Sequence, residues 1–194
     1  GGIPGDDGGD HRALGVAGQP MVPGEEPIVT LMSSSDGFPE ALGVVPTAGR
    51  WFTAAESQDR RAAVAVVGAG LARRLWPAGD AVGHRVRALP DTVWLTVVGV
   101  VGDLQYEEFG EDGEADRLQI HVPYSREPWG GAALMVRAAA DPAALAEPVR
   151  RTVRGVHSSV AVFAVMTMAE VRSYTTAGDR IWTVTNYDNA YLGR

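Results

Sequence analysis

The chain has 194 residues, a formal net charge of −7, no cysteine and no lysine, so all 17 basic residues are arginine. The negative charge argues against a nucleic-acid surface and against tight docking on anionic lipid. The absence of lysine excludes P-loop, Schiff-base and kinase chemistry, and the absence of cysteine excludes thiol catalysis, thiolate metal sites and disulfides. No run approaches the roughly 18 apolar residues of a membrane span.

The first 27 residues are rich in glycine, proline and aspartate, and they predict an arm or loop. They lack the basic end and apolar stretch of a signal peptide, so a protein working outside the cytoplasm would have lost its targeting segment. A strand is expected at residues 28–33. A short helix should follow, capped by Ser35, running to Leu42 and ended by Gly43.

The middle of the chain alternates apolar runs with turn signals. A helix is expected at residues 69–76, where Pro77 stops it. The apolar runs predict strands at residues 63–67, 85–89, 93–101 and 118–122.

A β-α-β unit is predicted near the end, with strands at residues 132–137 and 160–165. Asp141 is its expected N-cap, followed by proline at the first helical position. Pro148 should kink the helix. Leu145, Val149, Val153 and Val156 share one face of this helix, which should pack on the two strands.

The last predicted helix begins with a capping box formed by Thr167 and Glu170. Met166 and Val171 stand at the positions of a hydrophobic staple. We expect this helix to run to about residue 176, and residues 181–194 form a polar tail.

Residues 64–72 read VAVVGAGLA, and Gly68 and Gly70 after a strand suggest the start of a dinucleotide-binding turn. Arg73 occupies the position of the third glycine, and Pro77 stops the helix early. No acidic residue follows at the required distance. An ordinary strand–turn–helix is the favoured interpretation.

An acidic stretch in the second half of the chain is a candidate cation site. Seven acidic residues lie between Asp103 and Asp116, and Asp112, Glu114 and Asp116 could bind Ca²⁺, but the spacing is not that of an EF-hand loop. A solvated loop is therefore favoured.

The four histidines show no metal-ligand spacing, and His121 is expected to face solvent from its strand. Trp51, Trp76 and Trp94 are interpreted as core anchors. The sequence thus predicts no catalytic residue, no cofactor-binding residue and no metal site.

Six segments, in order, resemble one family over about residues 24–180. They are EALGVVPTAGRWFTAAE from Glu40, VAVVGAGLARRLWPAGDAVGHRVRAL from Val64, TVVGVVGDL from Thr96, VPYS, the strand–DPAAL–helix unit from Ala132, and TMAEV from Thr167. The chain resembles the MacB-like periplasmic core domain of MacB/FtsX-type ABC-transporter permeases. This resemblance implies an α+β fold with two lobes, a membrane-proximal β-α-β lobe and an inserted mixed lobe.

The implied boundaries are an arm and first strand at residues 1–35, the inserted lobe at 36–131, the β-α-β unit and the start of a connecting helix at 132–180, and the tail at 181–194. Three departures stand out. A strand and helix that precede this region in the family are absent, the chain turns polar where a membrane helix should follow Arg180, and Gly68-Ala69 replaces a polar pair.

The resemblance implies a non-enzymatic domain on the extracytoplasmic side of the cell membrane, coupling ATP-driven movement to substrate export or partner control. The implied partners are the membrane helices of the same permease, a separate ATP-binding subunit, and a second permease copy or an extracytoplasmic protein, but no nucleic acid. Two alternatives remain open. One is a free-standing ligand-binding or sensing domain, and the other is a nucleotide-dependent oxidoreductase resting on Gly68 and Gly70 alone.

Overall fold

The computed structural model describes residues 10–20, 24–104, 118–128, 132–156, 162 and 165–170. The chain divides into two compact units, Gly1–Arg137 and Ala138–Arg194. We call them the sheet unit and the C-terminal unit. Within the described ranges, no helix is both long enough and apolar enough to cross a membrane.

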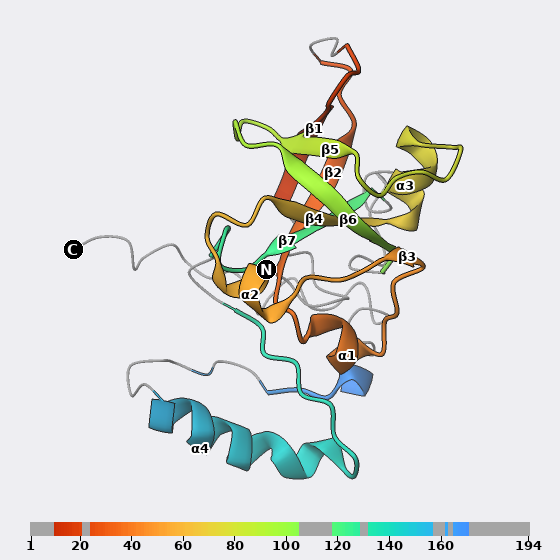
Figure 1. The fold of residues 1–194 in the computed structure, drawn as a ribbon. Coiled ribbons are helices and arrows are strands. Elements are labelled where there is room, and N and C mark those ends of the chain that lie inside the picture. Colours follow the sequence, from red (N-terminus) through yellow and green to blue (C-terminus); the bar gives the residue numbers. More distant parts are fainter. Residues whose placement is uncertain are drawn as a thin grey trace, which may run out of the picture. The chain divides into compact units, whose positions relative to one another are not determined.

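The sheet unit contains seven strands and three short helices among its described residues (Figure 1). In chain order they are β1 Asp10–Val16, β2 Ile28–Ser34, α1 Phe38–Leu42, β3 Ala48–Gly49, α2 Ala54–Gln58, β4 Val64–Gly68, α3 Ala69–Leu75, β5 Arg85–Ala88, β6 Leu95–Val101 and β7 Gln119–Pro123.

The seven strands form one sheet that closes on itself, in the order β3-β6-β4-β7-β2-β1-β5 with a further pairing of β5 to β6. Strand β5 closes the ring because Val86 pairs with Val16 of β1 and with Leu95 of β6. The short β3 lies beside the second half of β6, where Ala48 pairs with Val100. Closure shortens the strand edges that would otherwise be open to other chains.

Strand β1 corrects the prediction of an arm or loop for the first 27 residues. It pairs antiparallel with β2, from Asp10 opposite Leu31 to Ala13 opposite Ile28. Only Leu14 and Val16 among its seven residues are large and apolar, and both are buried. The strand is therefore defined by its two neighbours more than by its own pattern.

Strand β2 lies on the other side of the predicted lobe boundary at residue 36 from β7, yet the two strands pair in parallel. Their register runs from Thr30 opposite Gln119 to Ser34 opposite Pro123. The first predicted strand therefore belongs to the same sheet as the strands of the predicted insert. The mixture of helices and strands confirms the α+β class, whereas the division into two lobes stays a prediction.

The predicted elements between residues 28 and 123 otherwise match the structure closely. Gly43 ends α1 with a φ of 71°, in the left-handed region that favours glycine. The predicted cap is wrong, because the N-cap of α1 is Gly37 and no side chain bonds there. The carbonyl of Ser35 instead accepts a hydrogen bond from Trp51 Nε1 at 3.0 Å.

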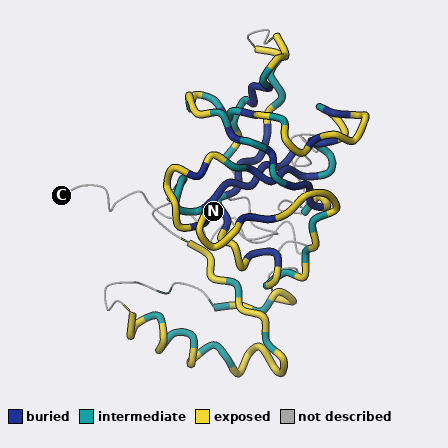
Figure 2. The backbone as a smooth tube through the Cα atoms, in the orientation of Figure 1, coloured by how far each residue is buried: buried dark blue, intermediate teal, exposed yellow. Residues whose placement is uncertain are grey.

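Two apolar clusters cover opposite faces of the sheet, as the two-residue period of a strand requires. On β4, Ala65 and Val67 belong to the larger cluster, and Val66 belongs to the smaller one. Trp51 and Trp76 are buried, which confirms them as core anchors, and Figure 2 shows the dark buried trace running through the sheet. Trp94 is only half-buried, with the Arg87 guanidinium 4.8 Å from its ring centroid.

The described part of the C-terminal unit begins with a 3₁₀ turn, Pro142–Leu145, followed by α4, Ala146–Val156. Asp141 caps the turn as predicted, because its Oδ1 accepts a hydrogen bond from the Ala143 N–H at 3.0 Å. Pro148 lies in the first turn of α4. A proline is tolerated at that position because the first amides of a helix have few intrahelical acceptors.

The predicted β-α-β unit is not formed among the described residues. Residues 132–137 are extended but belong to no strand, and neither Val162 nor Val165 is in a strand. No residue of α4 is buried, and Val156 is 82% exposed. A strand exists only where its backbone has a partner to pair with, and none of the described residues pairs with 132–137. Most of the second predicted strand lies outside the described residues.

The capping box at Thr167 is confirmed. The Thr167 N–H donates to Glu170 Oε2 at 2.6 Å, and the Glu170 N–H donates to Thr167 Oγ1 at 3.2 Å. Val171, the rest of the predicted helix and the polar tail lie outside the described residues.

Candidate functional site

The turn that carries Gly68 and Gly70 is occupied by a carboxylate of the protein itself. Asp103, just after β6, accepts a hydrogen bond from the Gly70 N–H through Oδ1 at 2.7 Å. Its Oδ2 lies 3.4 Å from Arg73 Nη2. The carboxylate therefore takes the place at the start of α3 where a dinucleotide would need its pyrophosphate.

Gly68 is required by this arrangement and not by a ligand. A Cβ at this residue would lie 2.8 Å from Asp103 Oδ1 and 3.3 Å from Gln119 Cβ. Gly68 is the N-cap of α3 and has no side chain to bond there, so Asp103 supplies the missing cap from another strand. The structure thus favours the strand–turn–helix interpretation.

Asp103 corrects one part of the acidic-loop prediction. Composition groups it with the solvated acidic stretch, but its carboxylate is bonded to α3. Residues 105–117 lie outside the described residues, so the Ca²⁺ alternative for Asp112, Glu114 and Asp116 stays as it was.

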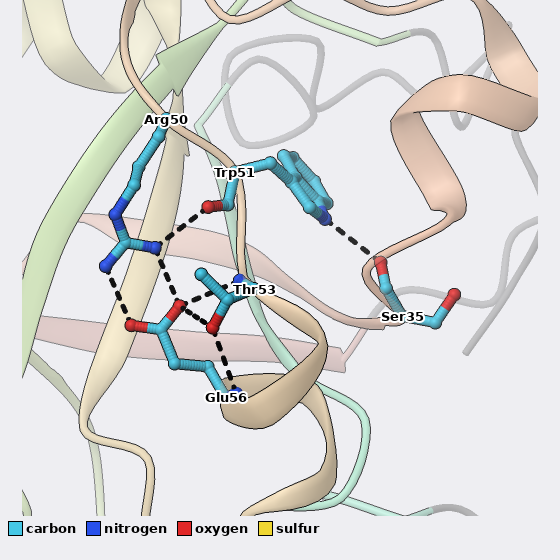
Figure 3. A network of polar contacts seen from close by, with 5 residues as sticks. All are labelled: Ser35, Arg50, Trp51, Thr53 and Glu56. Atoms are coloured by element: carbon cyan, nitrogen blue, oxygen red, sulfur yellow. Dashed lines mark hydrogen bonds and ion pairs between the residues drawn. The ribbon is translucent and has the colours of Figure 1, made fainter.

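The segment from Arg50 to Glu56 forms a polar network at the start of α2 (Figure 3). Arg50 makes two bonds to the Glu56 carboxylate, from Nη1 at 2.7 Å and from Nη2 at 2.8 Å. Glu56 also accepts the Thr53 N–H at 2.8 Å, and its own N–H donates to Thr53 Oγ1 at 3.2 Å. This is a capping box reinforced by a bidentate ion pair.

The network holds the Glu56 carboxyl in its charged form. The hydrogen bond from Arg50 is the largest cause, and the two bonds from Thr53 add to it, so the pKa of Glu56 falls to about 2 despite some burial. The same guanidinium donates to the Trp51 carbonyl at 3.0 Å. The network thereby fixes the backbone on both sides of the buried Trp51 and Phe52.

The fixed Trp51 forms one wall of an aromatic cage around His121. The centroid of the imidazole lies 5.1 Å from that of Trp51 and 5.5 Å from that of Phe38. His121 Nδ1 lies 3.0 Å from Ser34 Oγ. The side chain is 0% exposed, and burial lowers the pKa of His121 to about 3, so the ring is neutral at pH 7.

His121 therefore contradicts the prediction that it faces solvent. Strand β7 lies between β2 and β4, and all five of its residues are buried. Alternation predicts one wet face only where that face of the sheet is uncovered. Here Phe38 and Trp51 cover it, and sequence reasoning could not show that segments about 70 to 80 residues upstream return to this strand.

A half-open groove of about 430 Å³ lies beside the cage, within the sheet unit. One wall is the connection from β2 to α1, and the other is the extended segment 132–135. Its lining residues are Ser33, Ser34, Ser35, Gly37, Phe38, Ala41, Tyr124, Ala132, Ala133, Leu134 and Met135. Hydroxyl groups and apolar side chains line it, and none of these described lining residues is charged.

The arrangement offers little chemistry. Ser34 and His121 form a hydroxyl–imidazole pair that the sequence did not reveal, but both side chains are buried and the low pKa of His121 makes it a poor base. Among the described residues, no group of three or more possible metal ligands exists. Of the other histidines, His11 lies on β1, His84 stacks on Trp76 with centroids 5.0 Å apart, and His157 lies outside the described residues.

The comparison with protein families decides what this fold is. The model of the MacB-like periplasmic core domain matches residues 13–154. The chain belongs to this family. No curated protein matches the sequence.

Solved structures agree with the family at the level of the fold. The periplasmic region of MacB from Actinobacillus actinomycetemcomitans superposes with a TM-score of 0.58 at 15% identity, covering 85% of this chain and 71% of the other. The extracellular domain of the noncanonic ABC-type transporter YknZ from Gram-positive bacteria superposes with a TM-score of 0.50 at 16% identity, covering 82% and 78%. The chain is thus a MacB-like periplasmic core domain, the extracytoplasmic type of domain found in ABC-transporter permeases.

Proposed function

We propose that this MacB-like domain couples ATP-driven movement across a membrane to substrate export or to control of a partner. The single observation that carries the proposal is the family match over residues 13–154. ATP hydrolysis belongs to a separate ATP-binding subunit, since this chain contains no lysine for a P-loop.

The described structure supports a mechanical role. The ring of strands is a body in which each strand of the ring has two neighbours, so a displacement applied at one place is shared by the others. The capping box at Thr167 fixes the first turn of a helix that, by the family resemblance, leads toward a membrane span. A displacement of such a helix would bias one arrangement of the domain over another.

The proposal places the domain on the extracytoplasmic side of the cell membrane. Its partners are the membrane helices of the same permease and the ATP-binding subunit. A second permease copy or an extracytoplasmic protein would receive the movement, and nucleic acid is not among the partners.

A free-standing sensing domain is the second candidate, favoured by the groove beside Phe38. A volume of about 430 Å³ falls within the range of small-molecule sites. A sensing domain would change its conformation when a ligand enters the groove, whereas a coupling domain would change when nucleotide binds elsewhere.

Spin labels separate the two candidates without knowledge of the cargo. The chain has no cysteine, so Val45→Cys in the sheet unit and Val156→Cys in the C-terminal unit give two unique sites, and these valines are 76% and 82% exposed. In the reconstituted transporter, ATP should shift the distance distribution between the labels. An unchanged distribution during active ATP hydrolysis would contradict coupling and leave the sensing candidate ahead.

A further inference from the structure

We propose that Arg137 is the positioning residue through which movement of the C-terminal unit reaches the sheet unit, by way of α1. This inference rests on the coupling function proposed above. Arg137 is the last residue of the sheet unit, so a displacement that begins at Ala138 meets this side chain first.

Side chains, and not a strand, attach the segment 132–137 to the sheet unit. The segment pairs with no strand among the described residues. Met135 packs against the smaller apolar cluster, and Arg137 Nη1 donates to the Glu40 carbonyl at 3.0 Å. The segment can therefore move as a strap whose fixed point is at Arg137.

The C-terminal end of α1 is shaped to receive the guanidinium. Glu40 lies in the last turn, where carbonyls lack intrahelical donors and attract a cation. Gly43 follows with a φ of 71°, and a Cβ on it would lie 3.1 Å from Arg137 Nη2 and 3.3 Å from Nη1. Glycine at this residue thus serves both the helix end and the close approach of Arg137.

Helix α1 in turn contacts the centre of the sheet. The ring of Phe38 stacks on Trp51 with centroids 5.7 Å apart and lies 5.5 Å from His121 on β7. Contacts continue from Arg137 to α1 and from α1 to the middle of the sheet. Spatial continuity is only a route, so the claim needs a measurement of coupling.

The test uses spin labels within the sheet unit, at Val45→Cys after α1 and Val82→Cys before β5, where the side chains are 76% and 44% exposed. In the reconstituted transporter, ATP should shift the distance between these labels. Arg137→Met, which keeps much of the stem but removes the donors, should abolish most of the shift while ATP hydrolysis continues. The control is Arg154→Met, at an exposed arginine of α4.

Two further variants separate transmission from simple stability. Arg137→Lys, which retains a cation and a donor, should restore part of the shift. Gly43→Ala should displace the guanidinium and reproduce the loss even if Arg137→Met folds poorly. An equal shift in the parent and in Arg137→Met would overturn the role of Arg137. No shift in the parent at either this label pair or the Val45–Val156 pair would instead overturn the proposed function.

Discussion

Asp103 accepts a hydrogen bond from the backbone N–H of Gly70 at 2.7 Å and so joins the end of β6 to the first turn of α3. This one contact explains a glycine motif that resembles a nucleotide site. Gly68 makes room for a carboxylate that the protein supplies itself. The motif is therefore part of the fold, with consequences for stability and for ligand binding.

Removing the carboxylate should cost stability. Asp103→Ala takes away the side-chain cap that another strand supplies to α3, and losing a helix cap costs about 1 kcal/mol. Urea unfolding measures the difference. Asp36→Ala, at an exposed residue before α1, is the control and should change stability by less than about 0.5 kcal/mol. Equal stability of the parent and Asp103→Ala would refute the capping role.

The same occupancy predicts that NAD and NADP do not bind. A ligand at 100 times its dissociation constant stabilises a protein by about 2.7 kcal/mol, which a thermal melt resolves easily. The melting temperature of the chain should be unchanged by either dinucleotide. A dose-dependent rise would revive the oxidoreductase alternative.

The buried His121 predicts a pH dependence of stability. Its pKa is about 3 in the folded chain against an ordinary value of 6.5, so only the unfolded chain takes up its proton between these values. Its contribution to stability is complete above pH 6.5 and is lost as pH falls toward 3. The loss should be about 1.4 kcal/mol for each pH unit below about 6.

His121→Gln isolates this effect, because glutamine does not titrate and can still bond Ser34. Carboxylates elsewhere change the pH dependence of both proteins alike, so the difference between parent and variant is the quantity to measure. That difference should narrow as pH falls from 6.5 to 4. A constant difference across this range would show that His121 is not buried in its neutral form.

Glu56 predicts an effect at lower pH. Its pKa is lowered to about 2, first by Arg50, so the network stabilises the fold above pH 4.5 and loses this contribution as pH falls toward 2. Glu56→Gln should cost about 1 kcal/mol at pH 7, the usual value of a helix cap joined to an exposed ion pair. Glu25→Gln, at a residue outside this network, is the matched control. A variant as stable as the parent at pH 7 would mean that the network contributes nothing.

Gly99 tests how the segment before α2 is held to the sheet. A Cβ on Gly99 would lie 2.1 Å from the Arg50 carbonyl oxygen, so Gly99→Ala must push β3 away from β6. Such overpacking costs about 1–3 kcal/mol. Gly102→Ala adds the same methyl group where no atom lies within 4 Å, and it should be nearly neutral. Equal melting temperatures for the two variants would contradict this account.

Elements whose signal is local can be predicted from this sequence. The capping box at Thr167, the glycine that ends α1, and the apolar runs of β4 and β6 depend on neighbouring residues, and the structure confirms them. Arg73 in place of a third glycine is likewise a local signal, and it correctly favours a strand–turn–helix over a dinucleotide site.

The errors concern contacts between distant segments. His121 reads as half-exposed in the sequence because nothing there shows that Phe38 and Trp51 return to cover β7. Asp103 belongs to an acidic stretch by composition, yet its partner is 33 residues earlier in the chain. Residues 132–137 have the composition of a strand but no pairing partner among the described residues.

The central claim is that the helix beginning at Thr167 carries nucleotide-driven movement into this domain. The most direct measurement is the ATP-dependent distance shift between labels at residues 45 and 156 after Gly-Gly is inserted behind Thr167, which breaks the capping box to Glu170. The same insertion behind Gly79, in an exposed loop, is the control. We expect ATP hydrolysis to continue and the shift to disappear only with the insertion behind Thr167. A full shift in that variant would contradict the coupling role.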